Sequence, residues 1–293
     1  MSGITIALLA GFCFGLFQTV NRRTNQLLDA YRATFLTLLM GLLVLATFVT
    51  LTQDLGELRR APWTAFLGFG AAGIVHFFFG WTFLSLSQQR VGAARSGALV
   101  AAAPLFGTLG AAIALSEPVT LAMLGGVVLV TAGLVALSVR HGTGTPGGTT
   151  PWFGLAAALS WGSSPLFIRW GLERLPVPLI GVTVGLLAAS ATYGIALLVV
   201  GRRRRSEAIP AASLRWVAAG GTLVAIAIAL QWTSYDMITI AAALTLMQIA
   251  TPVVIVAAPI VVGTIAERPT FLMLAGTAAV MAGSTVVVLA AGS

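Results

Sequence analysis

The sequence predicts an all-α membrane protein in which ten transmembrane helices form two inverted five-helix repeats around a central cavity. Composition is the first reason: 58% of the 293 residues are hydrophobic, 8% are charged, and the mean hydropathy is +0.99. A water-soluble domain could not cover its surface with so few polar side chains. An internal repeat and the placement of the arginines are the second and third reasons.

Ten apolar stretches supply the helices. A hydrocarbon layer about 30 Å thick is crossed by about 20 residues of helix. Helices are favoured over single strands because a strand would leave backbone groups unpaired in lipid. The expected spans are 3–20, 31–51, 63–86, 95–115, 119–139, 152–170, 178–200, 214–235, 241–263 and 270–290.

A run rich in Gly, Thr and Pro near the middle of the chain predicts the boundary between the halves. We expect a first five-helix repeat at 1–141, a linker at 142–151 and a second repeat at 152–293, because the run HGTGTPGGTTP cannot continue a helix. Eight residues in seventeen aligned positions recur 150 residues later, which supports a duplication. They are Glu117, Thr120, Met123, Leu124, Gly126, Val130, Ala132 and Gly133.

The sixteen arginines, which are the only basic residues apart from two histidines, predict that the halves have opposite orientations. Twelve follow helices one, three, five, seven and nine, and each half splits six to two. This asymmetry is typical of inverted repeats. By the positive-inside rule the arginine-rich side is cytoplasmic, which places both termini outside. The other side receives Arg59, Arg60, Arg169 and Arg174.

His76 is the ionisable residue that lies farthest from the ends of its expected span, the third. Ordinary helical spacing would put Phe79 and Phe83 on its face and so form an aromatic surface with one polar group. Intramembrane ionisable residues are costly and invite a functional interpretation. The alternative is a histidine that bonds to a neighbouring helix.

Three further segments carry polar and aromatic candidates for substrate binding. Trp161, Ser163 and Ser164 precede Pro165, and this pattern indicates either a locally broken helix that faces a cavity or a packing kink. Gln231 and Tyr235 lie four residues apart beside Trp232, and Gln248 lies three before Thr251. Amides and hydroxyls of this kind also join helices in lipid without touching substrate. Weaker candidates on the first span are Phe14, Phe17 and Gln18.

Other conspicuous residues have structural explanations. Tryptophans near the span ends, such as Trp63 and Trp170, suit an interfacial belt. Glu117 and Glu267, each close to a proline, suit capping of the last helix of each half. Gly126 and Gly133, like Ala275, Ala279 and Gly283, suit close helix contact, either within the fold or between protomers.

The residue inventory argues against an enzyme. Two histidines, one cysteine and no intramembrane pair of acids leave hydrolytic metal, thiol and carboxylate chemistry without their parts. No phosphate-binding loop indicates ATP, so we expect no cofactor and no metal. The net charge of +8 is explained by membrane topology, and we expect no nucleic-acid partner.

The closing segments of the two halves, LSEPVTLAMLGGVVLVTAGLVAL and IAERPTFLMLAGTAAVMAGSTVVVL, resemble the paired motifs of the drug/metabolite transporter superfamily, EamA type. AAAPLFGTLGAAIALSEP and GLAAALSWGSSPLFIRWGL extend this resemblance to other helices. Within that superfamily the chain looks most like the YddG-type exporters of aromatic amino acids and metabolites. The resemblance implies a multi-pass protein of the bacterial inner membrane that works by alternating access. Family members commonly begin inside the cell, contrary to the arginine count.

From the resemblance and the residues together we expect export of small neutral or aromatic amino acids and related metabolites, by uniport or weak coupling. The first span carries no carboxylate of the kind that couples protons in small multidrug transporters. The alternatives are a proton-coupled multidrug efflux transporter and a non-transporting scaffold or lipid-modifying protein. The expected partners are a small-molecule substrate and the lipid bilayer, and a homo-oligomer is left open.

Overall fold

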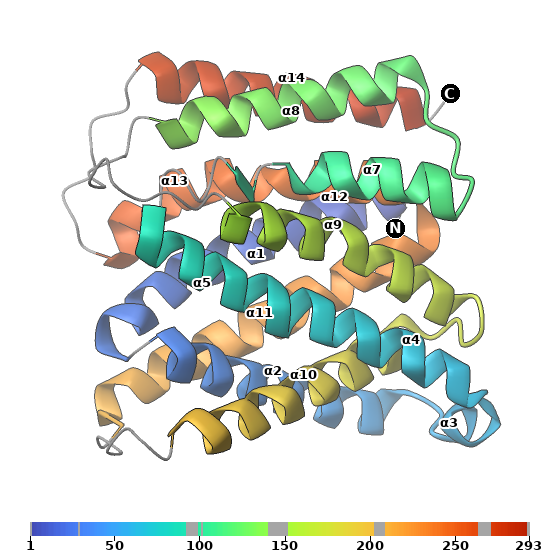
Figure 1. Ribbon diagram of the computed structural model, residues 1–293, viewed down its shortest axis with the longest axis vertical. Coiled ribbons are helices and arrows are strands. Elements are labelled where there is room, and N and C mark those ends of the chain that lie inside the picture. The colour runs from blue at the N-terminus through green and yellow to red at the C-terminus, as the bar shows by residue number, and fades with distance from the viewer. Residues whose placement is uncertain are drawn as a thin grey trace.

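The computed structural model describes residues 2–28, 30–91, 99–100, 102–139, 152–201, 209–262 and 271–291, and this part of the chain is helical without strands (Figure 1). The predicted linker lies outside these residues. Each expected span contains helix. The elements are α1 (Gly3–Leu27), α2 (Ala30–Thr52), α3 (Gly56–Arg60), α4 (Trp63–Gly73), η1 (Ile74–Phe79), α5 (Gly80–Val91), α7 (Ala103–Ala114), α8 (Leu121–Val139), α9 (Trp152–Leu172), α10 (Pro178–Gly201), α11 (Ala211–Met237), α12 (Ile240–Leu246), η2 (Met247–Ile249), α13 (Ala250–Val262) and α14 (Phe271–Ala291).

Five of the described helical segments are long and apolar enough to cross a membrane, namely Gly3–Asn25, Tyr31–Thr52, Trp63–Leu84, Pro178–Val199 and Ala211–Met237. Four shorter apolar segments come from α7, α8, α12–α13 and α14. The helix α9 belongs to neither group, although it has 21 residues. It is the helix that carries the polar stretch Trp161–Ser164.

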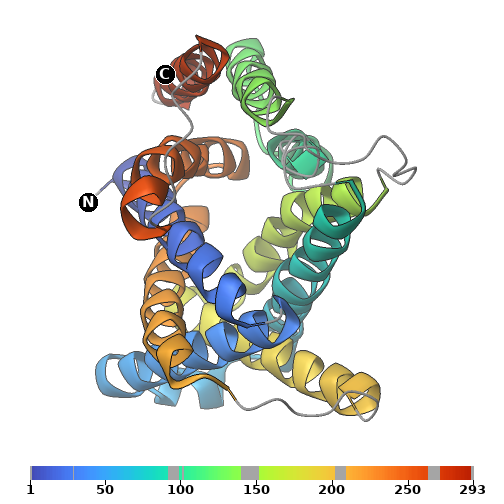
Figure 2. The ribbon, with the colours of Figure 1, turned by 90° about the vertical axis from the view of Figure 1, so that its left-hand side faces the viewer.

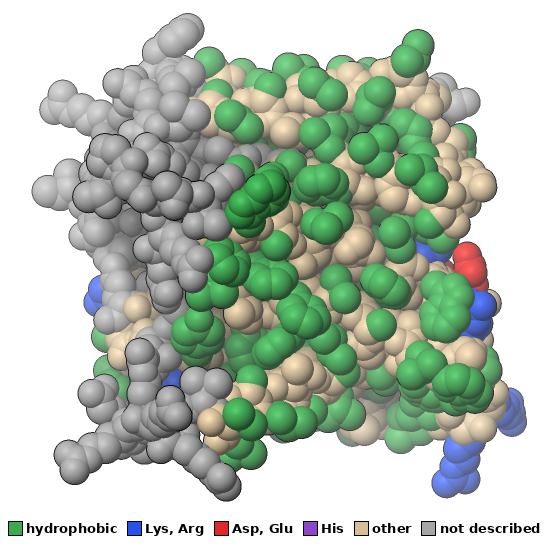
Figure 3. Space-filling view, viewed as in Figure 1, with side chains coloured by type: hydrophobic (Ala, Val, Ile, Leu, Met, Phe, Trp, Pro, Cys, Tyr) green, Lys and Arg blue, Asp and Glu red, His purple; other side chains and the backbone are tan. Residues whose placement is uncertain are grey.

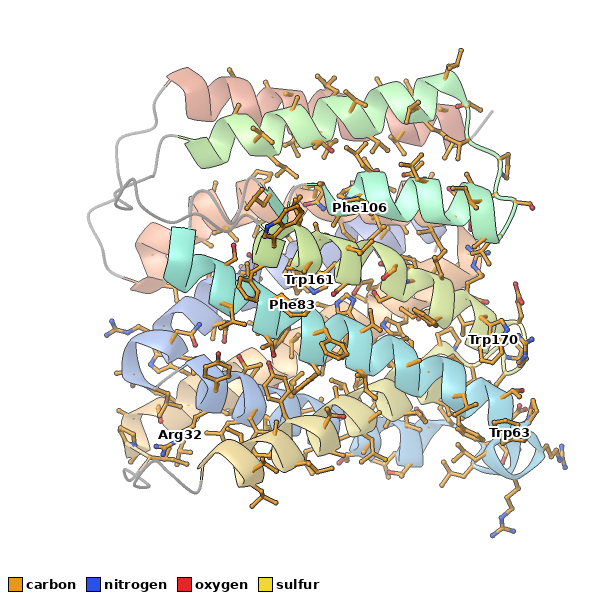
Figure 4. All side chains as sticks on the ribbon, in the orientation of Figure 1. Arg32, Trp63, Phe83, Phe106, Trp161 and Trp170 are labelled. Atoms are coloured by element: carbon orange, nitrogen blue, oxygen red, sulfur yellow. The ribbon has the colours of Figure 1, made fainter. Side chains whose placement is uncertain are left out.

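The distribution of surface side chains suggests that the membrane normal runs along the horizontal direction of Figure 1. On the face seen in Figure 3, hydrophobic side chains cover the middle, whereas charged side chains are confined to the two ends. Trp63 and Trp170 lie at the right-hand end and Arg32 at the left-hand end (Figure 4). Trp63 is 70% exposed, as expected for an interfacial tryptophan.

The packing partners of the helices exchange in pairs between the two halves. α1 packs on α11 and α13, and its counterpart α9 packs on α4–α5 and α7. α2 packs on α11, and its counterpart α10 packs on α4. The pairs α2 with α10, α7 with α12 and α8 with α14 join corresponding segments of the halves. Seen from one end, the helices form a ring with α8 and α14 at one pole and α2 and α10 at the other (Figure 2).

The contact between α8 and α14 has the same internal symmetry. A methyl group on Gly126 would lie 2.8 Å from the carbonyl oxygen of Gly283, and one on Gly133 would lie 2.7 Å from that of Gly276. Gly126 and Gly276 are repeat counterparts, as are Gly133 and Gly283, so an exchange of the halves converts one contact into the other. These small residues therefore serve contact within the chain, the first of the two alternatives.

Two of the membrane segments depart from regular α-helix. Between α4 and α5 the chain forms the π-helical segment η1, which contains His76. Between α12 and α13 it forms the 3₁₀ turn η2, which contains Gln248. Wide and tight turns of this kind often occur where a helix serves a function.

Candidate functional site

His76 is held by two polar contacts between η1 and α9. Its Nδ1 lies 2.8 Å from Oγ of Ser164. Nε1 of Trp161 donates to the backbone oxygen of His76 over 3.0 Å. Only 6% of His76 is exposed. Through Nδ1, His76 therefore bonds to a neighbouring helix, which was the alternative to a role in binding.

Glycine makes this close approach between the segments feasible. A methyl group on Gly80 would collide with the indole of Trp161. On the other side of the same segment, a methyl group on Gly73 would collide with the backbone of Gly185 in α10. The π-helical segment is thus clamped between α9 and α10.

The helix α9 is not broken at Pro165, so the first of the two alternatives, a locally broken helix, is wrong. α9 runs without interruption from Trp152 to Leu172. Proline removes the N–H that would bond the carbonyl four residues earlier, here that of Trp161. Ser164 Oγ donates to this carbonyl over 3.3 Å, which supplies the missing partner and lets the helix continue.

The aromatic surface differs from the prediction. Among the described residues, the rings in contact with His76 are those of Phe77 and Trp161, with centroids at 4.7 and 6.2 Å. Phe79 stacks on Phe83 with centroids 5.8 Å apart, and no ring contact joins Phe79 to His76 in the described residues. The prediction rested on ordinary α-helical spacing, whereas the wider π-turn changes which residues align with His76.

Phe83 extends the aromatic row to the start of α9. Its ring lies 6.2 Å from that of Phe153, and Phe79 also contacts Phe78. Phe79 is 41% exposed. Figure 4 shows Phe83 and Trp161 between the two charged ends of the molecule.

The candidates on α11 lie in the packed core. Nε2 of Gln231 donates to the hydroxyl of Tyr235 over 2.8 Å, as their spacing of four suggested. Trp232 is fully buried against Phe69, with ring centroids 6.0 Å apart. In the described residues, no hydrogen bond or ring contact connects this group with His76.

The remaining candidates occupy separate places. Ser163 bonds back to the carbonyl of Ser160 over 3.4 Å and does not reach His76. Gln248 is half-buried in η2, and the side chain of Thr251 lies outside the described residues. Gln18 of α1 is exposed within a membrane segment.

Two contacts between segments were missed as parts of a site. Phe17 of α1 stacks on Trp81 of α5 with centroids 5.6 Å apart and an interplanar angle of 16°. Thr82 and Tyr193 approach to 3.0 Å between α5 and α10. Phe17 was a weaker candidate and Trp81 was not a candidate, because spacing along one helix does not reveal partners on another.

Glu117 does not cap its own helix, contrary to expectation. Oγ1 of Thr120 accepts the N–H of Met123 at the start of α8. Glu117 instead reaches the second half, where Oε2 accepts the N–H of Ile240 over 2.8 Å and Oε1 lies 3.1 Å from Nη2 of Arg169. Arg169 also donates to the carbonyl of Ile238 over 2.7 Å. We call Glu117, Arg169, Ile238 and Ile240 the end clasp. Its proposed counterpart Glu267 lies outside the described residues.

Burial has the largest effect on the pKa of Glu117. Burial raises the pKa of its carboxyl above the ordinary value, while the Ile240 N–H and Arg169 act in the opposite direction. In the described part of the chain, no group of three His, Cys, Asp or Glu could hold a metal ion.

Comparison with known proteins supports this architecture. Residues 1–139 match the EamA-like transporter family. The match indicates a membrane transporter of small molecules, since that family groups transporters rather than enzymes, and with the long apolar helices it indicates a multi-pass membrane protein. The match covers residues 1–139. For the second half, the similarity to this family rests on its sequence repeat with the first half.

A solved structure described as "Crystal structure of protein" shares the fold over nearly all of both chains. It covers 98% of this chain and 99% of its own, with a TM-score of 0.77 and 21% sequence identity. At that identity the likeness concerns the fold alone. No curated protein matches the sequence.

Proposed function

We propose that this protein is a ten-helix exporter of the bacterial inner membrane that moves small neutral or aromatic amino acids and related metabolites by alternating access. The observation that carries the proposal is the contact of His76 with Trp161 and Ser164. It brings a polar group and aromatic rings together between segments of the two halves. In inverted-repeat transporters the substrate lies near the midplane between the halves.

The chemistry of these residues suits amphipathic cargo. Trp161 and Phe83 are half-buried and offer aromatic faces for dispersion and stacking contacts. His76 offers one hydrogen-bonding position, and no charged side chain takes part in its contacts with α9. Such an environment favours neutral or zwitterionic aromatic molecules over those with net charge.

The exchange of packing partners between the halves supports the inverted repeat that alternating access requires. Either half can adopt the conformation of the other, which would turn a site open to one side into a site open to the opposite side. Among the described membrane segments, the acid present is Asp236, which is exposed at the end of α11 and not buried along the segment. We therefore propose uniport or weak coupling.

Proteoliposomes that contain the purified protein test the proposal. We expect saturable uptake of labelled L-phenylalanine and L-tryptophan, unchanged by a pH gradient or a membrane potential. His76→Gln should reduce uptake about tenfold or more, whereas Trp63→Phe at the membrane surface should leave it unchanged. Proton-driven accumulation of aromatic cations would favour the multidrug alternative, and no flux of any solute would favour a scaffold.

A further inference from the structure

We infer that Ser164 fixes the neutral tautomer of His76 with its proton on Nδ1, so that Nε2 presents a lone pair to a ligand that donates an N–H. The inference rests on the proposed function for its ligand, but the tautomer is a property of the chain itself. It assigns Ser164 a positioning role and defines the polar group that the substrate must carry.

The hydroxyl of Ser164 faces two groups but has one proton. Pro165 has no N–H, so the carbonyl of Trp161 lacks its regular helical partner. Ser164 Oγ stands 3.3 Å from this carbonyl and 2.8 Å from Nδ1 of His76. A serine hydroxyl has one proton and can donate to only one of them.

The two tautomers leave different numbers of groups satisfied. If His76 carries its proton on Nε2, Ser164 must donate to Nδ1, and the Trp161 carbonyl loses its donor. If the proton is on Nδ1, His76 donates to Ser164 and Ser164 donates to Trp161. The second arrangement satisfies all three groups, and buried polar groups in native structures are overwhelmingly satisfied.

The other ring nitrogen is the one that we assign to the ligand. Nε2 has no hydrogen-bond partner among the described residues, whereas Nδ1 is engaged by Ser164. His76 retains 6% exposure. The Ser164 contact holds the imidazole through Nδ1, and the Trp161 bond holds the His76 backbone. Nε2 is therefore a positioned acceptor.

A positioned acceptor selects the chemistry of its ligand. An N–H donor is attracted to the lone pair, whereas a carbonyl or carboxylate oxygen in the same place is repelled. Two sources of this donor fit the proposed cargo: the ammonium of an amino acid and the ring N–H of a heteroaromatic compound.

Nitrogen NMR of the protein in lipid nanodiscs, with ¹⁵N-labelled histidine, reads the tautomer directly. The chain has two histidines, and His141→Gln leaves His76 as the single source of signal. We expect a protonated Nδ1 and an unprotonated Nε2. A proton on Nε2 would overturn the inference even if transport were intact.

Ser164 and Ser163 provide a matched pair of variants. Ser164→Ala removes the acceptor for Nδ1–H and should move the proton to Nε2. Ser163→Ala should change nothing, because Ser163 bonds to Ser160 and not to His76. Equal spectra for wild type and Ser164→Ala would contradict the positioning role.

Binding measured on the same samples separates the two donor sources. Loss of about tenfold in affinity for 1-methyl-L-tryptophan relative to L-tryptophan identifies the ring N–H. The same loss for N,N,N-trimethyl-L-phenylalanine, a zwitterion without an N–H, relative to L-phenylalanine identifies the ammonium. Either difference should shrink in Ser164→Ala, and if neither analogue binds more weakly than its parent, the donor requirement is wrong. If the parents do not bind at all while Nδ1 carries the proton, the proposed function fails and the tautomer stands.

Discussion

Trp161 shows how a single side chain can join two membrane segments through both its ring and its N–H. The ring packs against Gly80, while the N–H satisfies the carbonyl of His76. Water cannot replace this bond in a packed segment, so its loss leaves a buried carbonyl unsatisfied.

Trp161→Phe therefore tests the value of the N–H while it keeps an aromatic ring. We expect the free energy of unfolding to fall by about 1 to 3 kcal/mol, measured by denaturation in detergent micelles. Trp152→Phe on the same helix is the control, since Trp152 is 69% exposed and its change should cost little. Equal stabilities of the two variants would show that the Trp161 bond contributes nothing.

At this scale the sequence could predict contacts within one helix but not between helices. The spacing of Gln231 and Tyr235 placed them on one face, and they bond to each other. His76 and Ser164 are 88 residues apart, and their contact depends on how η1 and α9 pack. The substrate-binding roles of all ten candidates stay predictions.

Pairs of helices show how strongly the fold depends on small residues. α8 and α14 approach closely at Gly126, whereas the adjacent Gly125 has nothing within 4 Å of the position of an added methyl group. In lipid, close packing replaces the hydrophobic effect as the main force between helices.

Gly126→Ala should consequently destabilise the protein by about 1 to 3 kcal/mol through overpacking. Gly125→Ala changes the same helix by the same group and should be neutral or slightly stabilising. Thermal unfolding of both variants in one detergent makes the comparison. The outcome that opposes this account is a larger loss for Gly125→Ala.

The end clasp predicts a pH dependence at the element scale. Because burial raises the pKa of Glu117, the folded chain binds this proton more tightly than the unfolded chain. Its contribution to stability is therefore greatest at low pH and is lost as the pH rises through the raised pKa.

Relative to Glu117→Gln, the wild type should gain stability as the pH falls from about 7 towards the ordinary glutamate pKa of about 4.3. Glu173→Gln is the control, because the Glu173–Arg174 pair is looser, at 3.7 Å, and exposed. A relative loss at low pH would mean that the ion pair with Arg169 outweighs burial.

Helix existence was predictable, whereas helix irregularity was not. Apolar length reveals a membrane segment, and every expected span contains helix. The change from α to π winding at Ile74 keeps the same apolar composition, so hydropathy does not detect it. The contact between Glu117 and Ile240 was not predicted for a related reason. The Glu-Pro motif suggested a partner in its own helix.

At the scale of the whole molecule, the sequence repeat makes some packing partners predictable. A repeat at a fixed spacing of 150 residues implies that packing partners correspond, and the partners of α1 and α9 do correspond. The orientation of the molecule in the membrane rests on charge alone. Twelve arginines with Asp29, Glu207 and Glu267 follow the odd-numbered spans, whereas four arginines and five acids follow the even-numbered ones.

This asymmetry predicts that the end with both termini faces the outside of the cell. Arginine near span ends resists translocation, and both halves contribute equally to the bias. A reporter that is active only outside the cytoplasm should work when fused after Ser293 and fail when inserted at 202–208. Replacement of Arg202–Arg205 by glutamine leaves eight arginines against four, so the orientation should weaken without reversing. Activity of the insertion and silence of the Ser293 fusion would place the arginine-rich end outside.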